Sequence, residues 1–119
     1  MTRLLSITEL KEVAIILFID DFQRICNEEN IIITKHADKR LLKRGITVDD
    51  IMNAIRTGDI IKQYEDDKPF PSCLVLGSTE YNKFIHIVVS IDKNFLYIIT
   101  AYYPDEYLWE TDLRNRKER

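Results

Sequence analysis

The sequence has few residues that break secondary structure or cross-link chains: of 119 residues, three are Gly, three are Pro and two are Cys. This scarcity excludes collagen-like and low-complexity chains, and 45% hydrophobic with 31% charged residues is typical of a globular domain. Cys26 and Cys73 have neither CxxC nor Cys–His spacing, so we expect no disulfide framework and no zinc site. We therefore expect one domain, residues 1–119, in a reducing cytoplasm.

Long hydrophobic runs and an excess of positive charge are also missing. The apolar run Val13 to Ile19 is flanked by charged residues and is much shorter than the roughly 20 apolar residues that span a bilayer. It also lacks the basic start and small-residue cleavage site of a signal peptide, so we interpret it as buried helix and expect no membrane association. The net charge of −3 argues against a protein that coats nucleic acid nonspecifically.

The first half of the chain predicts helices. Apolar residues at three-to-four spacing predict a helix from Ser6 to about Asn27, and because they spread around its circumference we expect it to be buried or covered by a partner. Two further helices are each predicted to begin at a threonine cap and to end at a glycine, namely Thr34 to Gly45 and Thr47 to Gly58.

The second half changes to β-rich runs separated by short turn sequences. The predicted strands are Ile60 to Tyr64, Cys73 to Leu76, Phe84 to Ile91 and Phe95 to Tyr102. The turns are short enough for antiparallel hairpins. The predicted fold class is therefore α+β, with N-terminal helices packed on one antiparallel sheet of about four strands. Beyond it, we expect Trp109 to dock and the final charged residues, from Arg114 on, to fray.

The predicted second helix carries most of the local positive charge. His36, Arg40 and Lys43 or Arg44 follow one another at three-to-four spacing along one flank. An imidazole can move a proton near neutral pH, and neighbouring cations can hold a phosphate. The alternative is an ordinary solvated basic face.

Two further groups of residues suit the same chemistry. His86 lies on a predicted strand on one face with Phe84 and Val88, where it is either a satisfied core residue or a second proton carrier. Thr100 and Tyr102 point to one side of the last strand, where their hydroxyls either position a ribose or phosphate or reflect only β-propensity.

Other catalytic motifs are absent from the sequence. It contains no phosphate-binding glycine loop, no G-x-S-x-G elbow, no H-E-x-x-H and no dinucleotide fingerprint. Glu65, Asp66 and Asp67 flank a proline turn, and we interpret them as solvating a hairpin rather than binding a metal. We therefore expect neither a metal site nor a cofactor.

The stretch from Ile33 to Arg116 carries a set of short motifs that resembles one bacterial family, the domain of unknown function 4258, which is often encoded beside a YgiT-type zinc-finger antitoxin. The matching residues are Thr34-Lys35-His36-Ala37, Lys43-Arg44-Gly45-Ile46, Thr57-Gly58-Asp59-Ile60-Ile61, Tyr64, Asp67-Lys68-Pro69, Pro71-Ser72-Cys73-Leu74, Leu76-Gly77, His86-Ile87-Val88-Val89, Ile98-Ile99-Thr100-Ala101-Tyr102-Tyr103-Pro104-Asp105 and Trp109. That family is similar to the RelE and MqsR toxins, small α+β ribonucleases that act without metal and are neutralised by an antitoxin.

The resemblance implies a RelE-like core at residues 31–110, preceded by a helical extension (1–30) and followed by a charged tail (111–119). It also implies a type II toxin that cleaves RNA by attack of the ribose 2′-hydroxyl on the adjacent phosphate. The implied catalytic residues are His36, Arg40, Tyr102 and His86, and those that bind the substrate are Lys43, Arg44 and Thr100. The implied partners are RNA and a cognate antitoxin, and the N-terminal helix is a candidate for the antitoxin contact or for a homodimer.

Two alternatives remain open. In the first, the same sheet is a non-catalytic binding module for a protein or a nucleic acid, and the histidines carry out no chemistry. In the second, Tyr64, Tyr102 and Tyr103 line a site for a small ligand.

Overall fold

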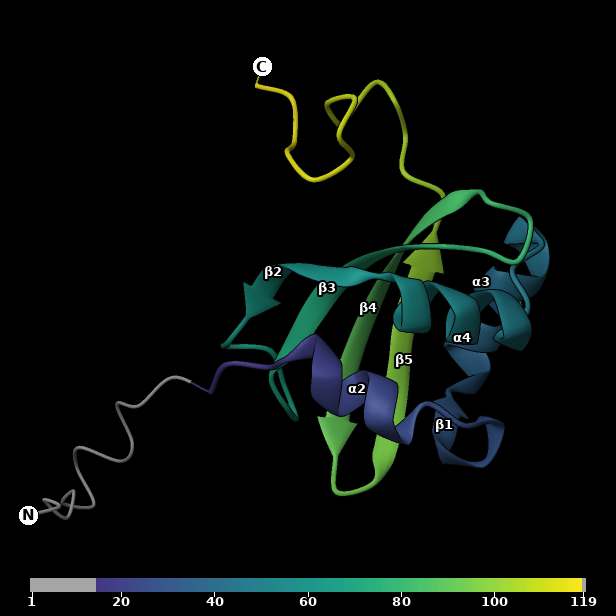
Figure 1. Ribbon diagram of the computed structural model, residues 1–119, viewed down its shortest axis with the longest axis vertical. Helices are drawn as coiled ribbons and strands as arrows, with labels where there is room; N and C mark the ends of the chain where they lie inside the picture. Colours follow the sequence, from purple (N-terminus) through teal and green to yellow (C-terminus); the bar gives the residue numbers. More distant parts are fainter. Residues whose placement is uncertain (1–14, 119) are drawn as a thin grey trace, which may run out of the picture.

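The computed structural model describes residues 15–118, which form one sheet with helices packed on it (Figure 1). The elements in chain order are α2 (Ile19–Ile25), a 3₁₀ turn (Glu28–Asn30), β1 (Ile31–Ile33), α3 (Lys35–Arg44), α4 (Val48–Thr57), β2 (Asp59–Tyr64), β3 (Ser72–Ser78), β4 (Phe84–Asp92) and β5 (Phe95–Tyr102). The predicted α+β class is confirmed. No helix within residues 15–118 is long and apolar enough to cross a membrane.

The sheet has five strands in the order β1-β5-β4-β3-β2. The strands from β2 to β5 are joined by antiparallel hairpins, as the short turn sequences predict. The fifth strand, β1, pairs in parallel with the start of β5, where Ile31 lies opposite Leu96 and Ile33 opposite Ile98. The sheet is therefore mixed, with one strand more than the four that the sequence indicates.

The helices begin at the threonines and end at the glycines that the sequence indicates. The Thr34 hydroxyl accepts the Ala37 N–H at 3.1 Å, and Gly45 follows α3 in a left-handed conformation with φ of 68°. At the start of α4, Thr47 and Asp50 form a capping box in which each side chain accepts the other's backbone N–H. Both helices are thus fixed locally and hold their side chains in defined positions.

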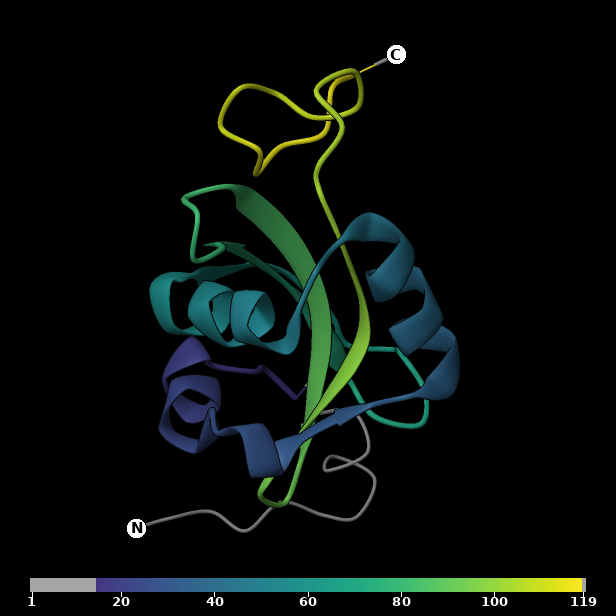
Figure 2. The same ribbon diagram turned by 90° about the vertical axis from the view of Figure 1, so that its right-hand side faces the viewer.

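One face of the sheet is covered by helices, and the other, which we call the open face, is covered in part by the C-terminal segment. Figure 2 shows α2 and α4 on one side of the strands, with α3 beside β5 and displaced toward the other side. The covered face contributes Val75, Ile87, Val89 and Ile98 to a core that also contains Phe22 of α2, and all five are at most 1% exposed. Side chains that alternate with these strand residues point to the open face.

The predicted N-terminal helix is confirmed at Ile19–Ile25 but is wrong for residues 15–18. Residues 15–18 are not helical, and α2 begins only at Ile19, while residues 6–14 lie outside the described part of the chain. The Gln63 amide accepts the Leu17 N–H at 3.1 Å and donates to the Leu17 carbonyl at 2.8 Å, which holds this segment beside β2. Ile15 and Phe18 are 58% and 63% exposed rather than buried.

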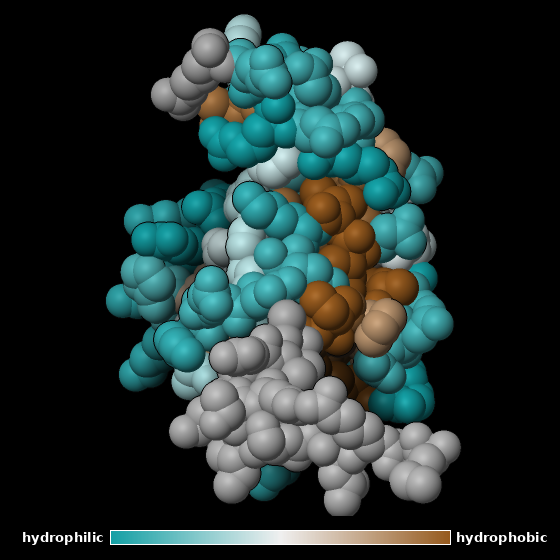
Figure 3. Space-filling view, turned by 90° about the vertical axis from the view of Figure 1, so that its left-hand side faces the viewer, coloured by the Kyte–Doolittle hydropathy of each residue, from teal (hydrophilic) through white to brown (hydrophobic). Residues whose placement is uncertain are grey.

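On the side of the molecule where β2 lies, apolar side chains form a continuous band (Figure 3).

The C-terminal segment folds back onto the sheet. Trp109 is buried, as expected, but the expected fraying is wrong for residues 114–117. The Asp112 carboxylate accepts the N–H groups of Arg114 and Asn115, and the Lys117 N–H donates to the Leu108 carbonyl at 2.9 Å. The Arg116 guanidinium lies 5.5 Å from the centre of the Trp109 ring. These hydrogen bonds, together with the contact between Arg116 and the Trp109 indole, hold the C-terminal segment in place.

Candidate functional site

The open face of the sheet carries rows of side chains that the strand register sets side by side. Thr100 lies opposite Val88, Val88 opposite Leu74, and Leu74 opposite Lys62. The neighbouring row places Tyr102 opposite His86. Because facing residues on adjacent strands lie within about 5.5 Å of each other, these rows bring β2 and β5 side chains to one surface.

A hollow of about 370 Å³ lies on this surface, under the C-terminal segment. It is lined by Ile61, Lys62, Tyr64, Leu74, Tyr102, Trp109, Arg114, Asn115 and Arg116. Three of these residues are cationic and none is acidic. Arg114 also forms an ion pair with the exposed Asp59 at 3.1 Å. The charge of Arg116 instead acts to lower the pKa of both tyrosines that line the hollow, Tyr64 and Tyr102.

Burial raises the pKa of Tyr102, and the neighbouring Tyr64 adds to this rise, while the positive charges of Arg116 and Arg44 oppose it. Burial likewise raises the pKa of Tyr64, against the effect of Arg116. Both phenols therefore carry their protons at neutral pH. We refer to Tyr64, Tyr102, Arg44 and Arg116 as the tyrosine–arginine site.

Arg44 joins the site from the last turn of α3. Its Nη1 donates to the Ala101 carbonyl at 2.7 Å and to the Thr100 hydroxyl at 3.2 Å. Arg44 and Thr100 are two of the three substrate-binding residues that the family resemblance implies, and the structure brings these two together. Lys43 and Arg40 are exposed. Arg40 lies between His36 and Arg44 at four-residue spacing, so it follows the same flank of α3.

His86 is fully buried at 0% exposure. Its Nε2 lies 2.7 Å from the Leu113 carbonyl, which can only accept, so Nε2 carries the proton and donates it. The neutral ring then has a free Nδ1, which lies 3.4 Å from the Tyr102 hydroxyl and can accept its proton. Burial lowers the pKa of His86, while its hydrogen bond to Leu113 acts in the opposite direction. Leu113 itself has φ of 59°, a conformation uncommon for a residue with a side chain.

The two histidines lie apart. His36 borders a second hollow, which Ser90 of β4 also lines. Ser90 lies four positions beyond His86 along the strand, a distance of about 13 Å at 3.3 Å per residue. His36 is thus placed away from Tyr102, and of the implied proton carriers only His86 and Tyr102 are neighbours.

The third tyrosine of the small-ligand alternative also lies elsewhere. Tyr103 borders a hollow with Thr47, Glu80 and Lys83, and the Lys83 ammonium lies 5.9 Å from its ring centre. Only Tyr64 and Tyr102 therefore share a site.

Two residues of the hollow, Lys62 and Arg116, were not predicted from the sequence. Period-two alternation along β2 offered a signal for Lys62, which shares a face with Tyr64, but nothing in the sequence indicated that Arg116 turns back toward the sheet.

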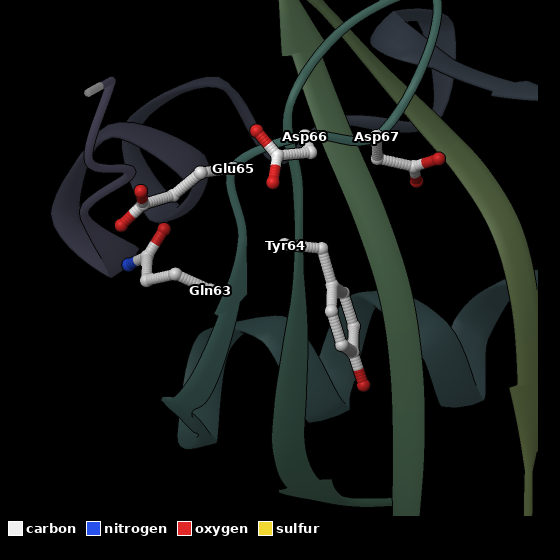
Figure 4. A pocket seen from close by; sticks show the side chains of 5 residues that line it. All are labelled: Gln63, Tyr64, Glu65, Asp66 and Asp67. Atoms are coloured by element: carbon white, nitrogen blue, oxygen red, sulfur yellow. The ribbon is translucent and has the colours of Figure 1, made fainter. Parts of the chain in front are cut away.

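A hollow of about 470 Å³ at the β2–β3 turn has the opposite charge. Figure 4 shows the carboxylates of Glu65, Asp66 and Asp67 around it, while the Tyr64 ring lies along the strand with its hydroxyl directed away from the two aspartates. Three acidic side chains repel a phosphate. Within residues 15–118, no group of three or more His, Cys, Asp and Glu side chains is placed to hold a metal ion.

Comparison with known families gives one match. The family model described as "Domain of unknown function (DUF4258)" matches residues 33–103, which is more than half of the chain. No curated protein and no solved structure gives a significant match. The matched region includes Arg44, Tyr64, His86 and Tyr102, whereas Arg116 lies beyond it. The chain therefore belongs to the DUF4258 family, a domain of unknown function.

Proposed function

We propose that this DUF4258 protein is a toxin-like endoribonuclease that binds single-stranded RNA at the tyrosine–arginine site and cleaves it without a metal ion. The observation that carries the proposal is the convergence of two protonated phenols and several cations on one open sheet face. Cations hold phosphates, and aromatic side chains offer surfaces for bases. The local positive charge exists in spite of the net charge of −3.

Cleavage without a metal requires a base for the 2′-hydroxyl and positive charge around the phosphate. The Tyr102 hydroxyl directs its own proton toward His86 Nδ1, so its lone pairs are available to a substrate. In the proposed step, Tyr102 takes the 2′-hydroxyl proton and passes its own to neutral His86. The 2′-oxygen bonds to phosphorus, the bond from phosphorus to the 5′-oxygen breaks, and water protonates the 5′-oxygen.

The cations have a separate role in this step. Arg116 lines the hollow together with Tyr102, and Arg44 donates to Thr100 and Ala101, directly before Tyr102 in β5, so both cations are near a phosphate that binds beside the phenol. Their charge stabilises the extra negative charge of the transition state. Afterwards His86 returns its proton to Tyr102, and Tyr102 gives the proton that it took from the 2′-hydroxyl to the hydroxide left by the water. The products are a 2′,3′-cyclic phosphate and a free 5′-hydroxyl.

The proposal is tested with the purified protein and a labelled single-stranded RNA in the presence of a metal chelator. We expect products that end in a 2′,3′-cyclic phosphate, identified by mass spectrometry, and no cleavage of DNA of the same sequence. Tyr102→Phe should bind RNA but not cleave it, and Arg116→Ala should weaken binding. Lys117→Ala is the matched control, because Lys117 lies in the same segment but borders a different hollow.

Binding without cleavage in the wild type would support the binding-module alternative instead. One observation favours that alternative, namely that the accessible imidazole, His36, lies away from Tyr102. Expression in a bacterial host distinguishes the toxin proposal from the binding-module alternative. Growth arrest with RNA decay that Tyr102→Phe abolishes supports the toxin, whereas intact RNA and normal growth contradict it.

A further inference from the structure

A second hollow on the open face has a different character from the tyrosine–arginine site. It encloses about 420 Å³ and is lined by Thr34, His36, Asp67, Lys68, Pro69, Phe70, Ser90, Tyr97, Ile98 and Ile99. Phe70 and Ile99 remain 38% and 42% exposed, so apolar surface is available to a ligand. A concave, mostly apolar hollow of this size with a few polar groups is typical of a ligand site.

The walls of this hollow are held in place by contacts of their own. The Phe70 and Tyr97 rings lie 6.4 Å apart, tilted by 33°. The Asp67 carboxylate accepts the Ser72 hydroxyl at 2.6 Å and the Lys68 N–H at 2.9 Å, which fixes the loop that carries Phe70. The hollow is therefore formed before any ligand arrives, which lowers the entropic cost of binding.

One polar group in the hollow has no hydrogen-bond partner among residues 15–118. Ser90 is 3% exposed, and its hydroxyl makes no hydrogen bond to another group within residues 15–118. Buried hydroxyls are nearly always paired, so an unpaired one at the wall of a hollow indicates a ligand that supplies the partner. His36, on the rim, adds an imidazole that can donate or accept.

The position of the hollow identifies the class of ligand. Tyr97 lines the hollow, and Thr100, whose hydroxyl accepts from Arg44 of the tyrosine–arginine site, lies three residues further along the same strand, which is about 10 Å. The apolar hollow and the tyrosine–arginine site are thus neighbours on one open face. Alternating cationic and aromatic surfaces are the pattern by which proteins hold a single-stranded nucleic acid, with phosphates on the cations and bases on the rings.

We propose that this hollow binds one nucleobase of the RNA strand whose phosphate lies at the tyrosine–arginine site. The base packs on Phe70 and Tyr97, and its polar edge bonds to the Ser90 hydroxyl and to His36. The inference rests on the proposed function and adds to it a base-binding subsite, with hydrogen bonds that can select one base over another.

The test compares two short uncleavable 2′-deoxy oligonucleotides of equal length and charge, one with all its bases and one abasic, by fluorescence anisotropy. We expect Phe70→Ala to weaken binding of the base-containing strand by roughly tenfold, the size of one stacking contact, and Ser90→Ala to weaken it by roughly fivefold, the size of one hydrogen bond. Both variants should bind the abasic strand like the wild type. Tyr81→Ala is the aromatic control, since Tyr81 is 81% exposed in a turn outside this hollow.

Ser90→Ala also separates a binding role from a structural one. Removal of an unpaired buried hydroxyl leaves no group unsatisfied, so the variant should unfold at the same urea concentration as the wild type or at a higher one. Equal losses for both oligonucleotides, or none, would overturn the base subsite while the proposed function stands. If Arg116→Ala changes the binding of neither strand, the proposed function fails instead. The nucleobase assignment would also be overturned if an apolar peptide competed equally well against the base-containing and the abasic strand and lost its binding in Phe70→Ala.

Discussion

The buried His86 makes the stability of the fold depend on pH. Burial lowers the pKa of His86 in the folded protein, whereas in the unfolded chain it titrates near 6.5. The groups that face the ring are the Tyr102 phenol and the Trp109 indole, both uncharged near neutral pH, with the Arg116 cation beyond the indole. The Leu113 carbonyl, which accepts from Nε2, favours the imidazolium, but the effect of burial is larger.

Between the folded pKa and pH 6.5, the unfolded chain therefore binds more protons than the folded one. The free energy of unfolding should be constant above about pH 6.5 and fall as the pH is lowered from there, by at most about 1.4 kcal/mol per pH unit, until the folded pKa is passed. The lowered pKa of the exposed Asp112 belongs to a separate window, since its ordinary value is 3.8. A measurement between pH 7.5 and 5 thus isolates the histidine.

The assay is urea unfolding at several pH values for the wild type, His86→Gln and His36→Gln. We expect the acid-dependent loss in the wild type and in His36→Gln, because His36 is an exposed residue at the rim of a hollow. His86→Gln should be less stable at pH 7.5 but should lose little more on acidification. An equal pH dependence in His86→Gln, or a wild type that becomes more stable toward pH 5, would refute the burial of a neutral imidazole.

Three further predictions concern packing, capping and thiol chemistry. A Cβ at Gly77 would collide with the backbone of Ala54, so Gly77→Ala should destabilise the fold by about 1–3 kcal/mol, and an unchanged Tm would contradict the contact between α4 and β3. Thr47→Ala removes half of a capping box and should cost about 1 kcal/mol in urea unfolding, with Thr47→Ser as the control that restores it. Burial raises the pKa of Cys73 to about 12, so a thiol reagent at pH 8 should modify it only as the chain unfolds, and rapid modification of the native protein would refute this.

Local signals in the sequence were sufficient for most of the helices and strands. Thr34, Gly45 and Thr47 act within one turn of their own position, so the bounds of α3 and α4 followed from them. The strand β1 was not predicted, because a three-residue strand is stable only through its pairing with Leu96–Ile98, far along the chain. The N-terminal helix was predicted too long because apolar spacing carries no information about Gln63, whose amide competes for the backbone of Leu17.

The candidate site was only half predictable for a similar reason. Tyr102 and Thr100 follow from the alternation of one strand, and Arg44 from the flank of one helix. Whether His36 and His86 meet depends on strand register and on where α3 lies, and neither is encoded locally. The position of Arg116 depends on the turn at Asp112 and on the indole of Trp109, which together reverse a charged segment that the sequence alone presents as a free end.

The site draws on residues 44, 64, 102 and 116, so it joins the second helix to the last turn of the described chain. During translation, Arg44 and Tyr64 leave the ribosome long before Arg116 does, and domains fold as their residues emerge. A nascent chain that already contains β2 and β3 has Arg44 and Lys62 but still lacks Arg114, Arg116 and the cover over His86. The newly made protein thus acquires the complete tyrosine–arginine site only when residue 116 has left the exit tunnel, and a chain cut short before that point has the sheet without Arg116.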